Sequence, residues 1–235
     1  MQIYIHEKKA KRKGNIGKIA IFTGLALLGL GFYISLQRDA STVLLLIVLA
    51  FVGTVVTQFG SIWFAKYGQS PRPDEVLSES LKGLSNNHAL FHYSLNTDHA
   101  LLGPSSAAAV IAYQVNGTIT YENGNYFARG SRGLFGGSRK RKLRGIERNA
   151  KREVKELTKV LHWAFPNRDD FEVHPLLVFV NDNVNLDLNE PPIPTAHAKK
   201  AKNVFKHIPA STGFSAEEIA ILAEKRGFRE ATADK

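Results

Sequence analysis

The sequence contains no cysteine among its 235 residues, and it has only one methionine and two tryptophans. Without a thiol the chain cannot form a disulfide, a cysteine-ligated zinc site, an iron–sulfur cluster or a cysteine nucleophile. Asp, Glu, Lys, Arg and His are also missing from two long stretches, residues 19–36 and 41–65. Apolar segments of this kind offer no ion path or proton relay, so the sequence argues against a transporter.

The two uncharged stretches are long enough to cross a membrane as helices. They contain eighteen and twenty-five residues, and a helix needs about 20 residues to span a hydrocarbon core of about 30 Å. Only residues 37–40 separate them, so we expect a tight transmembrane hairpin. A signal peptide also follows a basic leader, but its apolar region is shorter and no second span follows it at once.

The charges beside the spans predict their orientation. Six Lys and Arg lie within residues 1–18, whereas the connecting loop offers only Arg38 beside Asp39. By the positive-inside rule the amino terminus is cytoplasmic, and two crossings return the chain to the cytoplasm. We therefore expect an integral protein of the cytoplasmic or inner membrane with both termini in the cytoplasm.

Small residues recur every four positions along both spans. They are Ala20 and Gly24 on the first span and Gly53, Thr57 and Ser61 on the second. Such spacing favours close packing within the hairpin, and a dimerisation face is the alternative.

Beyond Gly68 the composition changes to that of an α+β domain. Period-2 and period-3.6 hydrophobic patterns alternate with turn signals, among them Asn116-Gly117 and Asn123-Gly124, which predict β-hairpin turns. Ser215 and Glu218 have the spacing of a capping box. The pattern predicts a helix at 74–84, a β-meander with strands at 88–95, 100–102, 107–115 and 118–121, a helix at 144–165, a strand at 173–180 covered on both faces, and helices at 196–207 and after Ser215, ending at Gly227.

Several short motifs accompany this α-β-β-β-α-β order. They are Pro73-Asp74-Glu75 at the first helix, Ala100-Leu101-Leu102-Gly103-Pro104 after Asp98-His99, Asn116-Gly117-Thr118-Ile119-Thr120-Tyr121, and Leu177-Val178-Phe179-Val180-Asn181. Together they resemble the nuclease-related (NERD) domain, a member of the PD-(D/E)XK restriction-endonuclease-like superfamily. The expected organisation is a basic cytoplasmic leader (1–18), the hairpin (19–65), a linker (66–73), a NERD-like domain (74–210) and a C-terminal helix and tail (211–235).

The resemblance implies a site for metal-dependent phosphodiester cleavage, built from an acid on the second strand and Glu-x-Lys on the third. Mg²⁺ prefers oxygen ligands, and the lysine stabilises developing negative charge. Asp98 matches the first acid and Glu75 matches a helical glutamate of the family, but Ile111-Ala112-Tyr113 stands in place of Glu-x-Lys. Glu122 is the only nearby replacement. Asp98 and Glu75 are therefore vestigial candidates, and their alternative roles are a turn cap and a favourable charge at a helix amino terminus.

Basic residues are concentrated in one block of the soluble domain. Between Arg129 and Lys155 there are eleven Lys and Arg against two acids. Three interpretations remain open: a solvated surface, contact with the anionic cytoplasmic leaflet, and contact with nucleic acid. The candidate binding residues are Arg139, Lys140, Arg141, Lys142, Arg144, Arg148, Lys151 and Arg152.

The sequence favours a non-enzymatic function. We expect a membrane-anchored, degenerate nuclease-like domain that acts as a binding module or as an accessory subunit of a membrane protein assembly. The alternative is a membrane-tethered, Mg²⁺-dependent nuclease or a DNA-binding protein. No catalytic residue, metal ligand or cofactor is expected, and Mg²⁺ enters only with the nuclease alternative. The histidines show no metal-binding spacing; His88 and His92 lie four residues apart on a predicted strand, which would separate them by about 13 Å.

Overall fold

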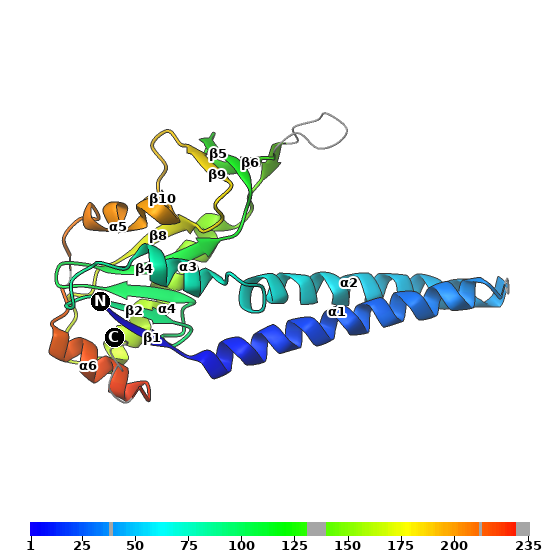
Figure 1. The fold of residues 1–235 in the computed structure, drawn as a ribbon, viewed down its shortest axis with the longest axis horizontal. Helices are drawn as coiled ribbons and strands as arrows, with labels where there is room; N and C mark the ends of the chain where they lie inside the picture. The colour runs from blue at the N-terminus through cyan, green and yellow to red at the C-terminus, as the bar shows by residue number, and fades with distance from the viewer. Residues whose placement is uncertain (38–39, 131–139, 212, 229–235) are drawn as a thin grey trace. The chain divides into compact units, whose positions relative to one another are not determined.

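The computed structural model describes residues 1–37, 40–130, 140–211 and 213–228 (Figure 1). The chain forms two compact units. One contains Glu7–Arg72, and the other combines Met1–His6 with Pro73–Lys235. The helical unit is thus inserted in the sequence between the first strand of an α+β domain and the rest of that domain.

The helical unit is an antiparallel pair, α1 (Glu7–Ser35) and α2 (Val43–Tyr67), with a 3-10 turn at Ala40–Thr42 before α2. Both helices are long and apolar enough to cross a membrane, and only 11% of the apolar window of each is buried. A core helix of a soluble protein would bury most of that window. α1 also begins well before residue 19, so the basic segment predicted as a leader continues directly into the apolar helix.

Small residues form the contact between the two helices. A Cβ atom on Gly17 would lie 2.6 Å from the Phe64 backbone nitrogen, and one on Gly24 would lie 2.7 Å from the Gly53 oxygen. The predicted packing within the hairpin is therefore confirmed for Gly24 and Gly53. Ser61 differs from the prediction, because its side chain is exposed and Gly60 takes its place in the contact.

Residues 2–5 belong to the α+β domain, although the sequence pattern assigned them to the leader. They form β1 (Gln2–Ile5), which pairs in parallel with β2 (Ala89–His92). Tyr4 is 5% exposed, and its ring stacks on Phe91 with 4.7 Å between the ring centroids. Burial of this one aromatic residue, together with the backbone pairing, fixes the first residues to the sheet.

The main sheet has six strands in the order β1-β2-β3-β4-β8-β10. β3 (His99–Leu102) and β4 (Ala107–Tyr113) continue antiparallel from β2, and β8 (Val173–Phe179) and β10 (Thr195–His197) extend the sheet in parallel. β8 lies between β4 and β10, and its side chains enter apolar cores on both faces, as its continuous apolar run predicted.

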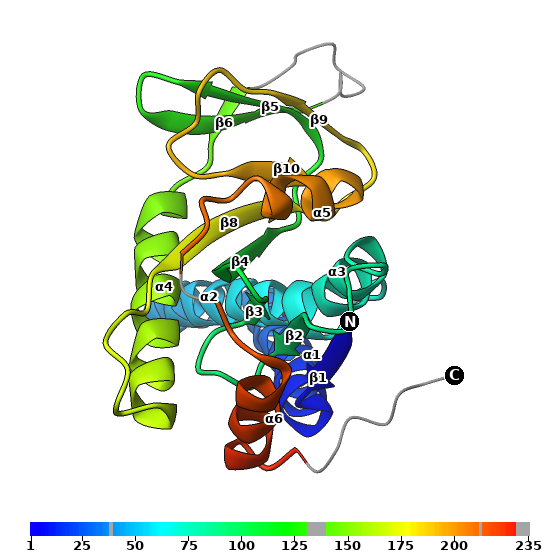
Figure 2. The same ribbon diagram turned by 90° about the vertical axis from the view of Figure 1, so that its left-hand side faces the viewer.

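Helices cover both faces of this sheet (Figure 2). Side chains of α3 (Pro73–Ser80) and α5 (Ala198–Lys206) pack on one face, and those of α4 (Ile146–Ala164) and α6 (Ala216–Lys225) pack on the other. The Ser215–Glu218 capping box before α6 is present as predicted. The domain is thus of the α+β class. The elements that build its main sheet follow the expected order of a helix, three strands, a helix and a strand, but three further strands of a second sheet lie in the sequence between β4 and α4.

The predicted meander is wrong beyond β4. β5 (Gly117–Glu122), β6 (Asn125–Arg129), β7 (Lys140–Lys142) and β9 (Val184–Asp187) form a second sheet in the order β7-β6-β5-β9. Asn116-Gly117 is thus a crossing between sheets, whereas Asn123-Gly124 is the predicted hairpin turn. A Cβ atom on Gly117 would lie 2.1 Å from the Arg129 oxygen, so this close approach of two backbones requires glycine.

Candidate functional site

Asp98, which the resemblance assigns to the first acid of a cleavage site, lies immediately before β3. Because His99 pairs with Val110, the antiparallel register places Asp98 opposite Ile111. Ile111 is 8% exposed and belongs to an apolar core with Ile119 and Tyr126. The position that the resemblance assigns to a second carboxylate therefore holds a packed apolar side chain.

Tyr113, which stands where the lysine of Glu-x-Lys would be, is also engaged within the domain. Its hydroxyl oxygen accepts a hydrogen bond from the Asn149 side chain at 3.3 Å, and burial raises the pKa of its phenol. A neutral phenol cannot replace the permanent positive charge of a lysine beside a developing anion. The Ile111-Ala112-Tyr113 segment thus offers neither the ligand nor the cation that the cleavage chemistry requires.

Glu153 on α4 is the acid that the structure brings to Asp98. This residue is 7% exposed, and one carboxylate oxygen accepts the Asp98 backbone N–H at 3.1 Å. The other oxygen accepts a hydrogen bond from the Arg152 guanidinium at 2.9 Å, which raises the pKa of Arg152. Both oxygens of Glu153 therefore have protein donors, and the carboxylate holds the loop between β2 and β3 against α4.

Glu153 was not predicted as a site residue, because in the sequence it stands out only as one of two acids in the basic block. A signal was present, since Glu153 lies three residues after Ala150 and four before Leu157, both on the apolar stripe of α4. An acid at that position of an amphipathic helix faces the core, and a buried carboxylate needs hydrogen-bond donors.

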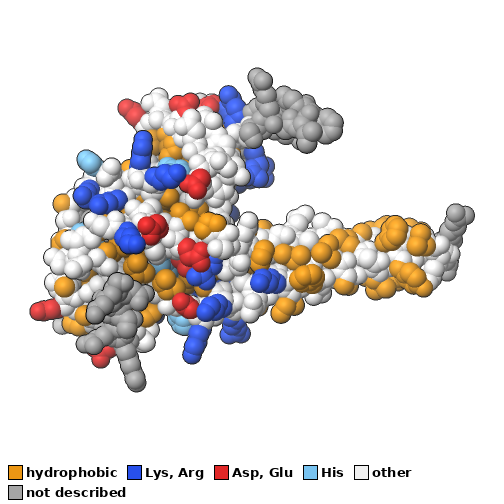
Figure 3. Space-filling model, in the orientation of Figure 1, with side chains coloured by type: hydrophobic (Ala, Val, Ile, Leu, Met, Phe, Trp, Pro, Cys, Tyr) orange, Lys and Arg blue, Asp and Glu red, His pale blue; other side chains and the backbone are white. Residues whose placement is uncertain are grey.

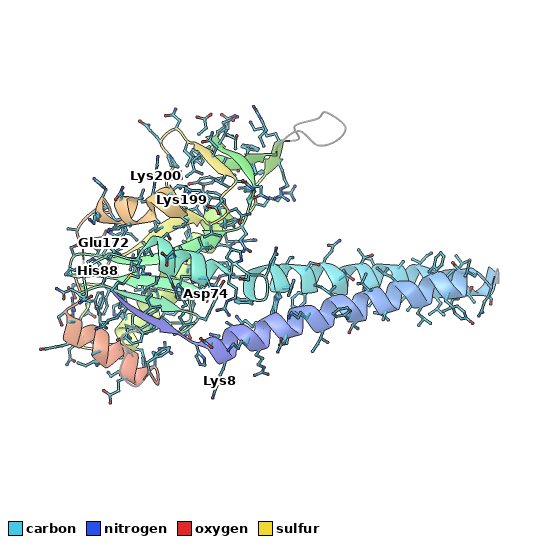
Figure 4. The ribbon with its side chains drawn as sticks, in the orientation of Figure 1. Lys8, Asp74, His88, Glu172, Lys199 and Lys200 are labelled. Atoms are coloured by element: carbon cyan, nitrogen blue, oxygen red, sulfur yellow. The ribbon has the colours of Figure 1, made fainter. Side chains whose placement is uncertain are left out.

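Glu75 and Glu122, the other candidate acids, do not complete a metal site with Asp98. Glu75 is exposed on α3, on the face of the sheet opposite to α4. Its neighbour Asp74, labelled in Figure 4, is fully buried and accepts a hydrogen bond from the Tyr93 hydroxyl at 3.0 Å. Glu122 forms an ion pair with Lys140. Within the described ranges, no group of three His, Asp or Glu side chains is placed to hold a metal ion. The described residues around Asp98 therefore do not fit a Mg²⁺ site.

A buried hydrogen-bond network of Ser78, His92 and His99 lies on the side of β2 and β3 that faces α3. The Nδ1 atoms of His92 and His99 are 2.7 Å apart, and the Ser78 hydroxyl lies 3.0 Å from His92 Nε2. One imidazole must donate to the other at this distance, since two lone pairs would repel. A serine hydroxyl, a histidine and a second histidine in this order resemble the nucleophile, base and orienting group of a catalytic triad. Both imidazole rings are buried, however, so a substrate cannot reach them in this structure. The network connects α3 to β2 and β3 and is a structural contact.

The pairing of His92 with His99 was not predicted, because the spacing along the sequence directs attention to His88 and His92 on one strand. The two partners come instead from opposite positions of the β2–β3 pair, where His92 is directly across from His99. Cross-strand side chains lie within about 5.5 Å at Cβ. Only the register, which the length of the loop at residues 93–98 decides, could have brought them together.

The basic block divides into cations with acidic partners and cations without them. Lys140 pairs with Glu122 and also lies over the Phe127 ring, 4.4 Å from its centroid, while Arg152 pairs with Glu153. In the part of the block that the structure describes, no ion pair is found for Arg141, Lys142, Arg144, Arg148, Lys151 and Lys155, all of which are exposed. Arg139 lies outside the described residues.

The cations without an ion pair follow a path along the sequence from β7 through the turn after it to α4, although Arg141 and Lys142, as neighbours on a strand, point to opposite faces of the sheet. β7 contributes its exposed edge, and Arg148, Lys151 and Lys155 occur at i, i+3 and i+7 along the solvent face of α4. Neighbours at these spacings lie about 5–6 Å apart on a helix. We call this path, formed by Arg141, Lys142, Arg144, Arg148, Lys151 and Lys155, the basic surface. It is suited to contact with an extended anionic partner.

Comparison of the chain with protein-family models, with curated proteins and with solved structures finds no match. The resemblance to the NERD domain therefore stays an expectation that rests on the motifs and on the order of elements.

Proposed function

We propose that this chain is an integral membrane protein in which a two-span hairpin anchors a cytoplasmic, nuclease-like domain without catalytic activity. The domain serves as a binding module or as an accessory subunit of a membrane assembly. The observation that carries the proposal is an exposed apolar hairpin attached to a domain whose Glu-x-Lys position is filled by core residues.

The surface of the hairpin supports membrane insertion. Among the described residues, all but three of the exposed large hydrophobic side chains lie between Ile16 and Ile62, and Phe22 and Leu44 are more than 70% exposed. Figure 3 shows hydrophobic side chains along the outside of both helices. In water such a surface would promote association, because exposed apolar patches of this extent mark membrane or protein contacts.

The base of the hairpin has the residues that favour a membrane interface. Lys13 Nζ lies 4.7 Å from the Tyr67 ring centroid and 5.9 Å from that of Trp63, and it donates to the Tyr67 hydroxyl at 3.1 Å. Lys18 lies over Phe64, 5.7 Å from the ring centroid. Tyr, Trp and the charged ends of lysines are enriched at the level of the headgroups. The opposite end of the hairpin would lie across the bilayer.

The strand order supports placing both ends of the hairpin on one side. β1 precedes α1 and pairs with β2, which follows α2, so both flanks of the hairpin belong to one folded sheet. A sheet cannot pair across a bilayer. The hairpin must then cross an even number of times, and the basic residues before Ile19 favour the cytoplasm as the side of the domain.

The contacts of Glu153 and Ile111 support the absence of nuclease activity. A cleavage site needs carboxylates that are free to bind Mg²⁺, and a carboxylate that already accepts two donors would have to give them up. The basic surface is then the part of the domain best suited to contact a partner, and the proposal does not depend on which anionic partner it meets.

Two measurements on the intact chain test the proposal. In isolated membranes it should resist extraction by alkaline carbonate, and after purification it should not nick supercoiled DNA in the presence of Mg²⁺ or Mn²⁺. Extraction by carbonate would contradict membrane insertion. Nicking that disappears in Asp98→Ala would establish the nuclease alternative instead, whereas nicking that persists in that variant would indicate a contaminant.

A further inference from the structure

The exposed side of α1 changes from basic to apolar within one residue. Lys8, Lys11, Arg12 and Lys18 are exposed, and they share one side of the helix with Ile19 and Phe22, which are 65% and 72% exposed. Ala10, Gly14 and Gly17 are buried on the other side. The side of α1 that would meet lipid chains after Lys18 thus carries a row of cations before it. Lys8, at the start of the helix, is labelled in Figure 4.

These cations differ in their distance from the apolar region. With a rise of 1.5 Å per residue, Lys18 stands at the boundary, Arg12 about 9 Å beyond it and Lys8 about 15 Å beyond it. The polar layer on each side of a bilayer is roughly 5–8 Å thick, and screening limits attraction to about 8–10 Å at physiological salt. Lys18 lies within the headgroup layer, Arg12 reaches it with a long side chain, and Lys8 stays outside.

An ion pair within α1 reduces the contribution of Lys11 to the positive charge of this side of the helix. Lys11 Nζ lies 2.8 Å from a Glu7 carboxylate oxygen, so this pair has little net charge. No ion pair is found for Lys8, Arg12 or Lys18 among the described residues. Lys18 and Arg12 therefore remain as the two cations that combine exposure, free charge and the right depth.

We infer that the basic part of α1 binds anionic phospholipid headgroups, with Lys18 making the largest contribution and Lys8 the smallest. The inference rests on the proposed membrane insertion and adds a lipid preference to it. Lipid is the partner because the cations continue the lipid-facing side of a helix, at the depth of the phosphates. A soluble polyanion would not distinguish Lys18 from Lys8, since both are exposed and carry the same charge.

The chain offers a direct reporter for this inference. Trp63 lies at the base of the hairpin, and the only other tryptophan, Trp163, is 57% exposed on the domain and can be replaced by phenylalanine. The full-length Trp163→Phe protein is reconstituted in vesicles that contain brominated phosphatidylglycerol or brominated phosphatidylcholine at the same fraction. Bromine quenches a tryptophan on contact, so the ratio of quenching measures which lipid collects around Trp63.

We expect brominated phosphatidylglycerol to quench Trp63 more strongly than brominated phosphatidylcholine. Lys18→Gln should lower this preference by about two- to five-fold, Arg12→Gln by less, and Lys8→Gln least. Lys18→Arg should restore it, and Lys82→Gln, which removes the same charge from an exposed lysine of the domain, should leave it unchanged.

Three outcomes would overturn the inference. Equal quenching by the two lipids would show no preference, while membrane insertion would still stand. If Lys8→Gln and Lys18→Gln reduce the preference for phosphatidylglycerol equally, the effect depends on net charge and not on depth in the membrane. If neutralising Lys140, Arg141 and Lys142 together reduces the preference, the domain makes the lipid contact. Absence of quenching by either lipid would contradict the proposed insertion itself.

Discussion

The backbone N–H of Asp98 donates to a carboxylate oxygen of Glu153 at 3.1 Å, and Arg152 donates to the other oxygen at 2.9 Å. This buried acid thereby fastens the loop between β2 and β3 to α4. The loop includes two residues with positive φ, Tyr93 and Asn96, both at 58°. Non-glycine residues adopt that conformation at a cost, so the loop needs fixed contacts of this kind.

Removal of the Glu153 carboxylate should destabilise the domain. Glu153→Ala leaves the Asp98 N–H without this acceptor and should lower the free energy of unfolding by about 1–3 kcal/mol. For a chain of this size that corresponds to a melting temperature lower by about 2–4 °C per kcal/mol, measured by scanning fluorimetry in detergent. Glu156→Ala is the matched control, because Glu156 forms a surface pair with Lys159 and its loss should change stability by less than about 0.5 kcal/mol. Equal effects of the two variants would refute the role of Glu153.

Bulk at the helix contact should separate α1 from α2. A Cβ atom on Gly60 would lie 2.7 Å from the Ile21 backbone nitrogen and 2.8 Å from the Gly17 oxygen, whereas one on Gly29 would meet nothing within 4 Å. We expect Gly60→Val to lower the melting temperature of the hairpin by several degrees and Gly29→Val to change it little. Helicity followed by circular dichroism in detergent during heating gives the comparison. The predicted packing fails if Gly29→Val is as damaging as Gly60→Val.

Loss of the histidine pair should loosen α3. His99→Ala removes the partner 2.7 Å from His92 Nδ1 and leaves a small cavity, which together should cost about 1–3 kcal/mol. A double-mutant cycle with Ser78→Ala tests the chain of contacts, because residues in one hydrogen-bond network show non-additive effects. Strict additivity of the two substitutions would mean that Ser78, His92 and His99 do not act together.

Acidification should weaken the domain in part through His88. Its ring lies beside Gly103 and 6.0 Å from the centroid of Phe205, and burial lowers the pKa of His88 below its ordinary value of 6.5. Below that value the unfolded chain binds a proton that the folded chain resists, so stability falls as the pH drops from about 7 toward the lowered folded pKa. His88→Gln should reduce this slope in melting experiments, with His207→Gln as the matched control at an exposed site. An unchanged slope in His88→Gln would contradict the prediction.

Local patterns were sufficient to predict the helical hairpin, the long helix α4 and the buried strand β8. Each depends on residues close in sequence: an uncharged apolar run, a 3.6-residue period and a continuous apolar stretch. The capping box at Ser215 and Glu218 and the turn at Asn123-Gly124 belong to the same class. The capping box satisfies backbone groups within its own turn, and the Asn-Gly pair adopts the positive φ angles of a tight turn, so neither needs a distant partner.

Features that depend on distant partners were not predicted. β1 is four residues long and pairs with a strand more than eighty residues away. Because such a short strand gives little local signal, residues 1–18 were predicted to be a basic leader. Asn116-Gly117 has the sequence of a hairpin turn, but in the structure it lies where the chain passes from one sheet to the other. Glycine is needed at position 117 because the Arg129 backbone leaves no room for a side chain. At the candidate site, the missing Glu-x-Lys was visible in the sequence, whereas the pairings of Glu153 with Asp98 and of His92 with His99 required the three-dimensional register.

The position of the domain relative to the membrane is tested most directly by labelling single cysteines. Because the natural chain has no cysteine, Gln37→Cys between the two helices and Asn123→Cys on the β5–β6 turn each create a unique thiol. In intact cells, a membrane-impermeant maleimide should label Gln37→Cys and should label Asn123→Cys only after permeabilisation. Labelling of Asn123→Cys in intact cells, or protection of both thiols, would contradict a two-span anchor with a cytoplasmic domain.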